Sequence, residues 1–148
     1  MSENKLKVNL HMGILKPVHD IFEAIVDPEK MKKYFISKST GRIEGGKTLK
    51  WTWEDFDAEH EIKVKQAEKD KLVSFTWDGS GVECKVNISF EPKDANKTLV
   101  KITEEEWTPD FEGAKRCMGQ VEGWTHFLCC LKAYLEYGIN LRAGGVIK

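Results

Sequence analysis

The sequence lacks a long apolar run, since none of its 148 residues lie in a stretch near the roughly 20 apolar residues that span a bilayer. Its first residues lack the apolar segment of a secretory signal, so we expect a cytoplasmic protein without a membrane span. A charge excess is also absent, because 23 Lys and Arg residues balance 24 Asp and Glu residues. Binding to a phosphate backbone requires a basic surface, so nucleic acid is not an expected partner.

The cysteines lack the spacing of a metal or redox site. Cys84, Cys117, Cys129 and Cys130 form no CxxC pair, and no histidine lies at a zinc-finger offset from them. Free cysteine is among the most buried residue types, so we expect core positions, with a reactive or ligating role as the alternative. The sequence also has no Ser-His-Asp set and no glycine-rich phosphate loop, so no metal or cofactor is expected.

The chain does contain enough apolar sequence for one core. Its length and its 41% hydrophobic residues fit a single domain over residues 1–148, since domains usually run to about 100 to 200 residues. A chain of this size buries roughly 68 to 70% of the surface that its unfolded form exposes, so no disulfides are needed. The sequence carries no signal for the oligomeric state.

The first third of the chain predicts one strand followed by two short helices. Apolar and polar residues alternate over residues 5–12, as in a half-buried strand. Apolar side chains then follow at helical spacing over residues 18–25, after Pro17 at the first helical turn. Pro28 ends this helix and can begin a second short one.

From residue 37 onward the apolar period is that of strands. Gly45 and Gly46 are a two-residue hairpin signal between expected strands at residues 39–44 and 49–53. Further strands are predicted near residues 62–64, 73–77, 82–90 and 98–107. Hairpin connections predict an antiparallel sheet, and strands grouped apart from helices predict an α+β fold.

The longest helix is predicted near the end of the chain. Its apolar arc spans roughly 200°, which is wider than contact with one sheet requires. The second side of this helix therefore faces a cavity or is covered by residues 17–35. The tail after Gly138 has few apolar groups, and we expect it to be mobile. The apolar positions are Cys117, Val121, Trp124, Phe127, Leu128, Cys130, Leu131, Tyr134, Leu135 and Tyr137.

The element order resembles the activator of Hsp90 ATPase homologue 1-like (AHSA1) family, within the START-like or Bet v 1-like (SRPBCC) superfamily. The resemblance covers about residues 5–137. It implies a helix-grip fold, in which a seven-stranded antiparallel sheet wraps around the C-terminal helix and encloses a cavity. Superfamily relatives use this cavity for lipids, hormones and polyketides, and a few are enzymes. The matching residues are Pro17, Val18, Ile21, Phe22, Asp27, Pro28, Gly45, Gly46, Gly123 and Trp124.

A cavity for an apolar ligand needs apolar walls and a few convergent polar groups. Glu104 and Glu106 continue the apparent core face of the last strand, where a buried carboxylate is costly unless it is paired or hydrated. One of them would form a polar end of the cavity, unless the strand bulges and both point into water. The candidate wall residues, which can alternatively just fill the core, are Trp51, Trp53, Trp77, Trp124 and Leu128.

Three functions follow, in order of preference. The first is binding of a small apolar molecule, and the second is a co-chaperone-like protein-interaction module with a chaperone as partner. The third is acid-base catalysis of the polyketide cyclase type, with Glu104 or Glu106 as the acid. Eukaryotic co-chaperones of the family carry a further N-terminal domain, whereas this chain begins directly with the first strand. We therefore expect it to stimulate a chaperone ATPase weakly or not at all.

Overall fold

A seven-stranded antiparallel sheet is the framework of the computed structural model, which describes residues 4–147. Its spatial order is β1-β7-β6-β5-β4-β3-β2, so β2 to β7 pair in chain order and β1 pairs with β7. The predicted antiparallel α+β fold is confirmed. The strands are β1 (Leu6–Ile14), β2 (Lys38–Ser39), β3 (Thr48–Trp53), β4 (Ala58–Glu68), β5 (Leu72–Trp77), β6 (Cys84–Asp94) and β7 (Lys97–Trp107).

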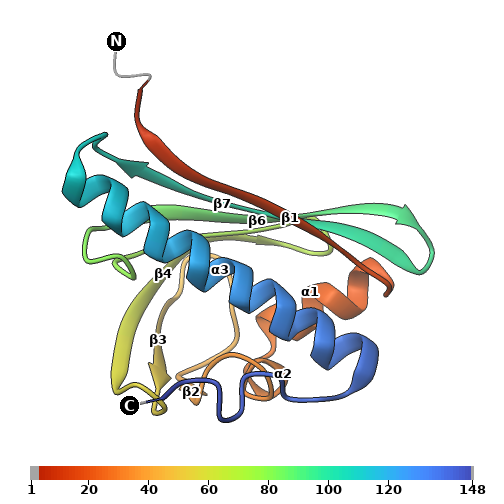
Figure 1. The fold of residues 1–148 in the computed structure, drawn as a ribbon. Coiled ribbons are helices and arrows are strands. Elements are labelled where there is room, and N and C mark those ends of the chain that lie inside the picture. The colour runs from red at the N-terminus through yellow and green to blue at the C-terminus, as the bar shows by residue number, and fades with distance from the viewer. Residues whose placement is uncertain (1–3, 148) are drawn as a thin grey trace.

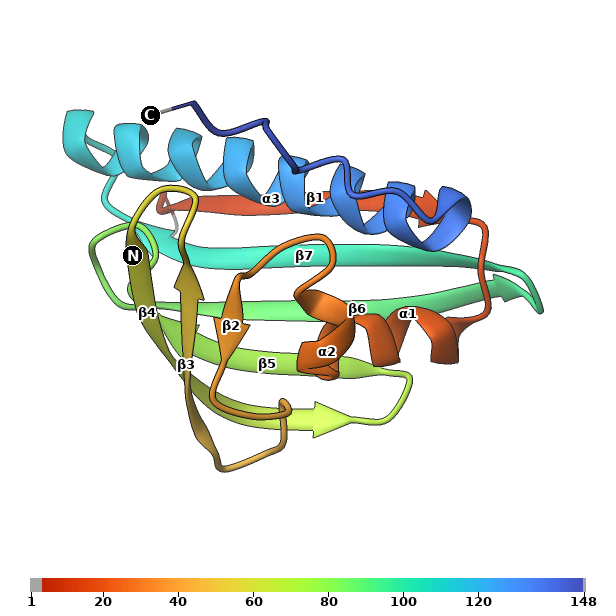
Figure 2. The ribbon, with the colours of Figure 1, turned by 90° about the horizontal axis from the view of Figure 1, so that it is seen from below.

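Three helices lie on the inner face of this curved sheet. The long helix α3 (Phe111–Tyr137) runs alongside β1, β7 and β6, whereas β2 and β3 cross its direction (Figures 1 and 2). The short helices α1 (Val18–Val26) and α2 (Pro28–Met31) lie towards its C-terminal end. The Asp110 side chain caps α3 by accepting from the Gly113 N–H, and Gly138 ends the helix with φ 68°.

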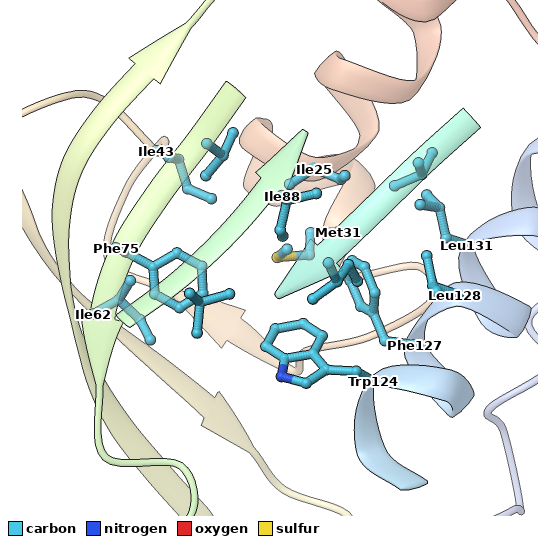
Figure 3. Close-up of a cluster of buried hydrophobic side chains, with 14 of the residues drawn as sticks. Ile25, Met31, Ile43, Ile62, Phe75, Ile88, Trp124, Phe127, Leu128 and Leu131 are labelled. Atoms are coloured by element: carbon cyan, nitrogen blue, oxygen red, sulfur yellow. The ribbon is translucent and has the colours of Figure 1, made fainter. Parts of the chain in front are cut away.

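Side chains from both layers meet in one core (Figure 3). The alternation in β6 buries every second residue from Cys84 to Phe90, as the period of a half-buried strand requires. These side chains pack towards α3, whose central residues are buried. The residues of this core labelled in Figure 3 are Ile25, Met31, Ile43, Ile62, Phe75, Ile88, Trp124, Phe127, Leu128 and Leu131.

Two strand predictions are wrong at their ends. The strand expected at residues 39–44 stops at Ser39, because the following segment packs on α1 instead of β3. Ile43 donates its backbone N–H to the Val26 carbonyl oxygen over 3.1 Å, and its side chain is buried. Val82 lies in the turn before β6 and is exposed, although the alternation placed it in the strand.

The second side of α3 is covered by the turn that follows α2. The Tyr34 ring stacks on Tyr134 with a centroid distance of 5.4 Å, and Phe35 contacts Phe127 at 4.7 Å. Much of the wide apolar arc is therefore explained by packing. Two positions of the predicted arc are exposed: Val121 at 36% and Tyr137 at 73%.

The tail after Gly138 runs back along α3 (Figures 1 and 2). Arg142 anchors it, because its Nε donates to Asp55 Oδ2 over 2.9 Å. The tail therefore has a specific contact that its composition does not reveal. Within residues 4–147, no helix combines the length and the apolar character needed to cross a membrane.

Candidate ligand-binding site

A cleft of about 850 Å³ opens beside the N-terminal half of α3. Its other sides are the β3–β4 hairpin, the turn after β5 and the C-terminal tail. This volume falls within the range of about 300 to 1,000 Å³ found for small-molecule pockets. The lining side chains that matter below are Phe35, Trp53, Phe56, His60, Trp77, Gln120, Glu122, Trp124, His126 and Arg142.

The apolar walls of the cleft are aromatic rings that contact one another. The Trp77 and Trp124 centroids are 5.5 Å apart, and Trp53 lies 6.2 Å from Trp77 and 5.8 Å from Phe56. These rings come from β3, β5, α3 and the β3–β4 turn. Because each ring packs against another, the walls are held in place without a ligand.

A buried carboxylate fixes two of these rings from behind. The Trp124 and Gln120 side chains donate to Glu104 Oε1 over 2.7 and 2.8 Å, and Trp77 Nε1 donates to Oε2 over 2.9 Å. Glu104 has no exposed surface and does not line the cleft. With both oxygens accepting from N–H donors, Glu104 positions the indoles and is not placed to donate a proton to a ligand.

Glu106 points away from the core. The β1–β7 register shifts so that Lys7 pairs with Glu105 and Leu6 with Trp107, which leaves Glu106 between the two pairs. Trp107 is buried and Glu106 is exposed. The expectation that Glu106 continues the core face is therefore wrong for this residue, because a bulge moves the following side chain to the inside.

The predicted wall residues divide into two groups. Trp53, Trp77 and Trp124 line the cleft. Trp51 and Leu128 are buried in the core and are absent from the cleft lining, so they support the wall from behind. Trp51, for example, packs against Trp53 at 6.1 Å and Phe75 at 5.5 Å.

Sequence reasoning missed several polar groups of the cleft. His60 was expected at the surface, but its half-buried ring packs 5.7 Å from Trp53 and 5.5 Å from Trp77. Its Nδ1–H donates to Asp78 Oδ1 over 2.8 Å. The signal was present, since His60 is in phase with the buried Ile62 of the same strand. Arg142 had no comparable signal, because its place depends on the path of the tail.

The cysteines occupy mainly core positions. Cys84, Cys117 and Cys130 are buried, and Cys129 is half-buried. Burial, together with the charge of Glu104, raises the pKa of the Cys84 thiol to about 11. Over residues 4–147 the structure contains no group of three or more His, Cys, Asp or Glu side chains arranged to hold a metal ion.

Comparison with protein families identifies the relatives of this fold and cleft. The family model described as Activator of Hsp90 ATPase homolog 1-like protein matches residues 16–136. The chain belongs to this AHSA1 family. The resemblance found in the sequence is thereby confirmed. No curated protein matches the chain.

Solved structures extend the AHSA1 relationship. A Staphylococcus saprophyticus protein is 37% identical over 93% of this chain and 96% of its own, with a TM-score of 0.81. The Aha1 dimer from Colwellia psychrerythraea is 23% identical over 90% of this chain and 98% of its own, with a TM-score of 0.76. A START superfamily protein from Mycobacterium smegmatis is 14% identical over 88% and 97%, with a TM-score of 0.70. The last two similarities show the fold alone.

Proposed function

We propose that this AHSA1 protein binds a small, flat and largely apolar molecule in the cleft beside α3. The observation that carries the proposal is the convergence of Trp53, Trp77 and Trp124 around a cleft of about 850 Å³. Flat rings offer a large contact area to a planar ligand. Because Glu104 already fixes two of the indoles, binding would not require these side chains to be ordered first, and this lowers its entropic cost.

Two glycines of α3 support the same function. Gly119 and Gly123 lie one helical turn apart and line the cleft, and a Cβ on either would meet no atom within 4 Å. Glycine in a helix interior costs roughly 0.5 to 1 kcal/mol relative to alanine, and no packing contact requires it here. The two glycines instead keep this wall of the cleft free of side chains.

The geometry favours binding over acid-base catalysis. Glu104 lies behind the indoles with both oxygens accepting hydrogen bonds, and Glu106 is exposed outside the cleft. Neither candidate acid therefore reaches a ligand between Trp77 and Trp124. The protein-interaction alternative has support from family membership only.

The test is a binding screen with planar apolar compounds, followed by tryptophan emission and thermal unfolding. Binding next to three indoles should quench or shift their emission. A ligand at a hundredfold excess over Kd should stabilise the folded protein by about 2.7 kcal/mol through mass action. Native mass spectrometry of the purified protein would identify a ligand that is retained from the expression host.

A matched pair of variants assigns the signal to the cleft. Gly123→Leu places a large side chain in the cleft and should abolish binding. Val121→Leu enlarges an exposed residue of the same helix outside the cleft lining and should leave binding unchanged. The proposal is overturned if no compound changes the emission or melting temperature, or if both variants bind equally well.

A further inference from the structure

The charged group at the tail side of the cleft points to the chemistry of the ligand. We propose that the ligand carries an ionised acid group, such as a carboxylate or sulfonate, and that this group binds the Arg142 guanidinium. This inference rests on the proposed binding function and specifies its ligand class. It would make Arg142 the residue that selects anionic aromatic molecules over neutral ones.

Arg142 is held in a fixed position by its surroundings. Its side chain is 13% exposed, and the guanidinium carbon lies 5.5 Å from the Phe56 centroid and 6.0 Å from the Phe35 centroid. Both rings also line the cleft. Cation–π contacts of this kind orient the guanidinium without using any of its N–H donors.

Most of the donors on Arg142 remain available. Its Nε donates to Asp55 Oδ2 over 2.9 Å, and among residues 4–147 neither Nη atom makes a hydrogen bond. The pair is therefore joined by one bond instead of a two-bond fork, and Asp55 Oδ1 is buried without a partner among these residues. The edge formed by the two Nη atoms has the geometry that binds an oxyanion through two parallel hydrogen bonds.

The charge around the cleft is consistent with an anionic ligand. Arg142 is the only Lys or Arg among the lining residues of the described chain, and Glu122, on the exposed surface of α3, is the only acidic one. The aromatic walls exclude water from one side of the guanidinium, and this strengthens its attraction to an anion. The partner Asp55 weakens that attraction, so its removal should have the opposite effect to removal of Arg142.

The experiment compares two fluorescent probes that share one ring system. 8-Anilinonaphthalene-1-sulfonate carries a sulfonate, and N-phenyl-1-naphthylamine does not. The measured quantity is the ratio of their affinities for each variant. Arg142→Met should lower the preference for the sulfonate about tenfold, which corresponds to about 1.4 kcal/mol, with the Kd of the neutral probe changed less than about twofold.

Two further variants separate charge recognition from anchoring of the tail. Asp55→Asn should raise the preference for the sulfonate, because it leaves the Arg142 charge without its partner carboxylate. Lys65→Met removes one exposed positive charge outside the cleft lining and should leave the ratio unchanged. These opposite shifts at positions 142 and 55 are not expected if Arg142 only holds the tail.

Two results would overturn the inference in distinguishable ways. If Arg142→Met and Asp55→Asn weaken both probes equally, Arg142 acts only as a tail anchor, and the proposed binding function stands. If neither probe binds the wild-type protein, and planar compounds also leave its emission unchanged, the binding function and the inference both fail.

Discussion

The indole N–H of Trp124 lies 2.7 Å from Oε1 of Glu104, so the central helix is hydrogen-bonded to a fully buried carboxylate of β7. Trp77 of β5 donates to the other oxygen of the same carboxylate over 2.9 Å. A buried charge is costly unless it is hydrogen-bonded, and here N–H donors of Trp77, Trp124 and Gln120 supply that compensation. One charged side chain therefore links the sheet, the helix and two walls of the cleft.

Replacing Glu104 by Gln should destabilise the fold by about 1 to 3 kcal/mol. The new amide NH₂ would face an N–H donor from Trp77, Trp124 or Gln120, which leaves buried donors without an acceptor. Urea unfolding followed by circular dichroism measures the loss. The matched control Glu106→Gln should change stability by less than about 0.5 kcal/mol, since Glu106 is exposed. Equal effects of the two substitutions would contradict the role assigned to Glu104.

Leu128→Ala should cost about 2 to 5 kcal/mol, the range for truncation of a large aliphatic side chain in a core. Leu128 is buried between α3 and the sheet (Figure 3). Val121→Ala on the same helix should cost less than about 1 kcal/mol, because Val121 is exposed. Chemical denaturation of both variants measures the difference. A loss below about 1 kcal/mol for Leu128→Ala would place this residue outside the packed core.

Gly123→Ala should stabilise the folded protein by roughly 0.5 to 1 kcal/mol and weaken ligand binding. The added methyl group enters the open space of the cleft and meets no protein atom within 4 Å, so the helix gains stability without a clash. Thermal unfolding without a ligand and probe titration provide the two readouts. A gain in stability with unchanged affinity would show that Gly123 does not shape the binding surface.

Alkylation should distinguish Cys129 from the other thiols. Since the pKa of Cys84 is raised to about 11, only about one Cys84 side chain in a thousand is a thiolate at about pH 8. Cys117 and Cys130 are also buried, whereas Cys129 is half-buried. We expect iodoacetamide to modify Cys129 alone in the folded protein and all 4 cysteines after unfolding. Rapid labelling of Cys84, detected by peptide mass spectrometry, would contradict its buried, neutral state.

The Glu23–Arg42 pair should make a small contribution to stability that disappears in acid. Two hydrogen bonds of 2.7 and 3.0 Å from Arg42 lower the pKa of Glu23 below its ordinary value of 4.5. The folded state therefore favours the ionised form, and this stabilisation is fully present above the unfolded pKa and lost as pH falls through the folded pKa.

Glu23→Gln tests this pH dependence. We expect a loss of at most about 1 kcal/mol near neutral pH, since the pair is partly exposed, and a loss near zero at about pH 3. Urea denaturation of the wild type and the variant at several pH values measures the difference. Glu61→Gln, on an exposed side chain, is the control and should show no such trend. A difference that grows towards acid pH would contradict the sign of the pKa shift.

The sequence by itself determined the order and type of the main elements. Alternation in β6 and the helical spacing in α3 are local patterns, because each reflects which side of one element faces the core. The same reasoning predicted Trp53, Trp77 and Trp124 as cleft residues, and they line the observed cleft. His60 was open to this reasoning as well, since it shares the inward phase of Ile62.

Only the tertiary structure decided which polar groups reach the cleft. A bulge between β1 and β7 buries Glu104 and exposes Glu106, and alternation within one strand does not reveal a register shift against its neighbour. Arg142 joins Asp55 across 87 positions of the chain, and this pairing depends on the reversal of the tail at Gly138. Such contacts depend on the relative placement of distant segments, which the folded core determines and local sequence periods do not encode.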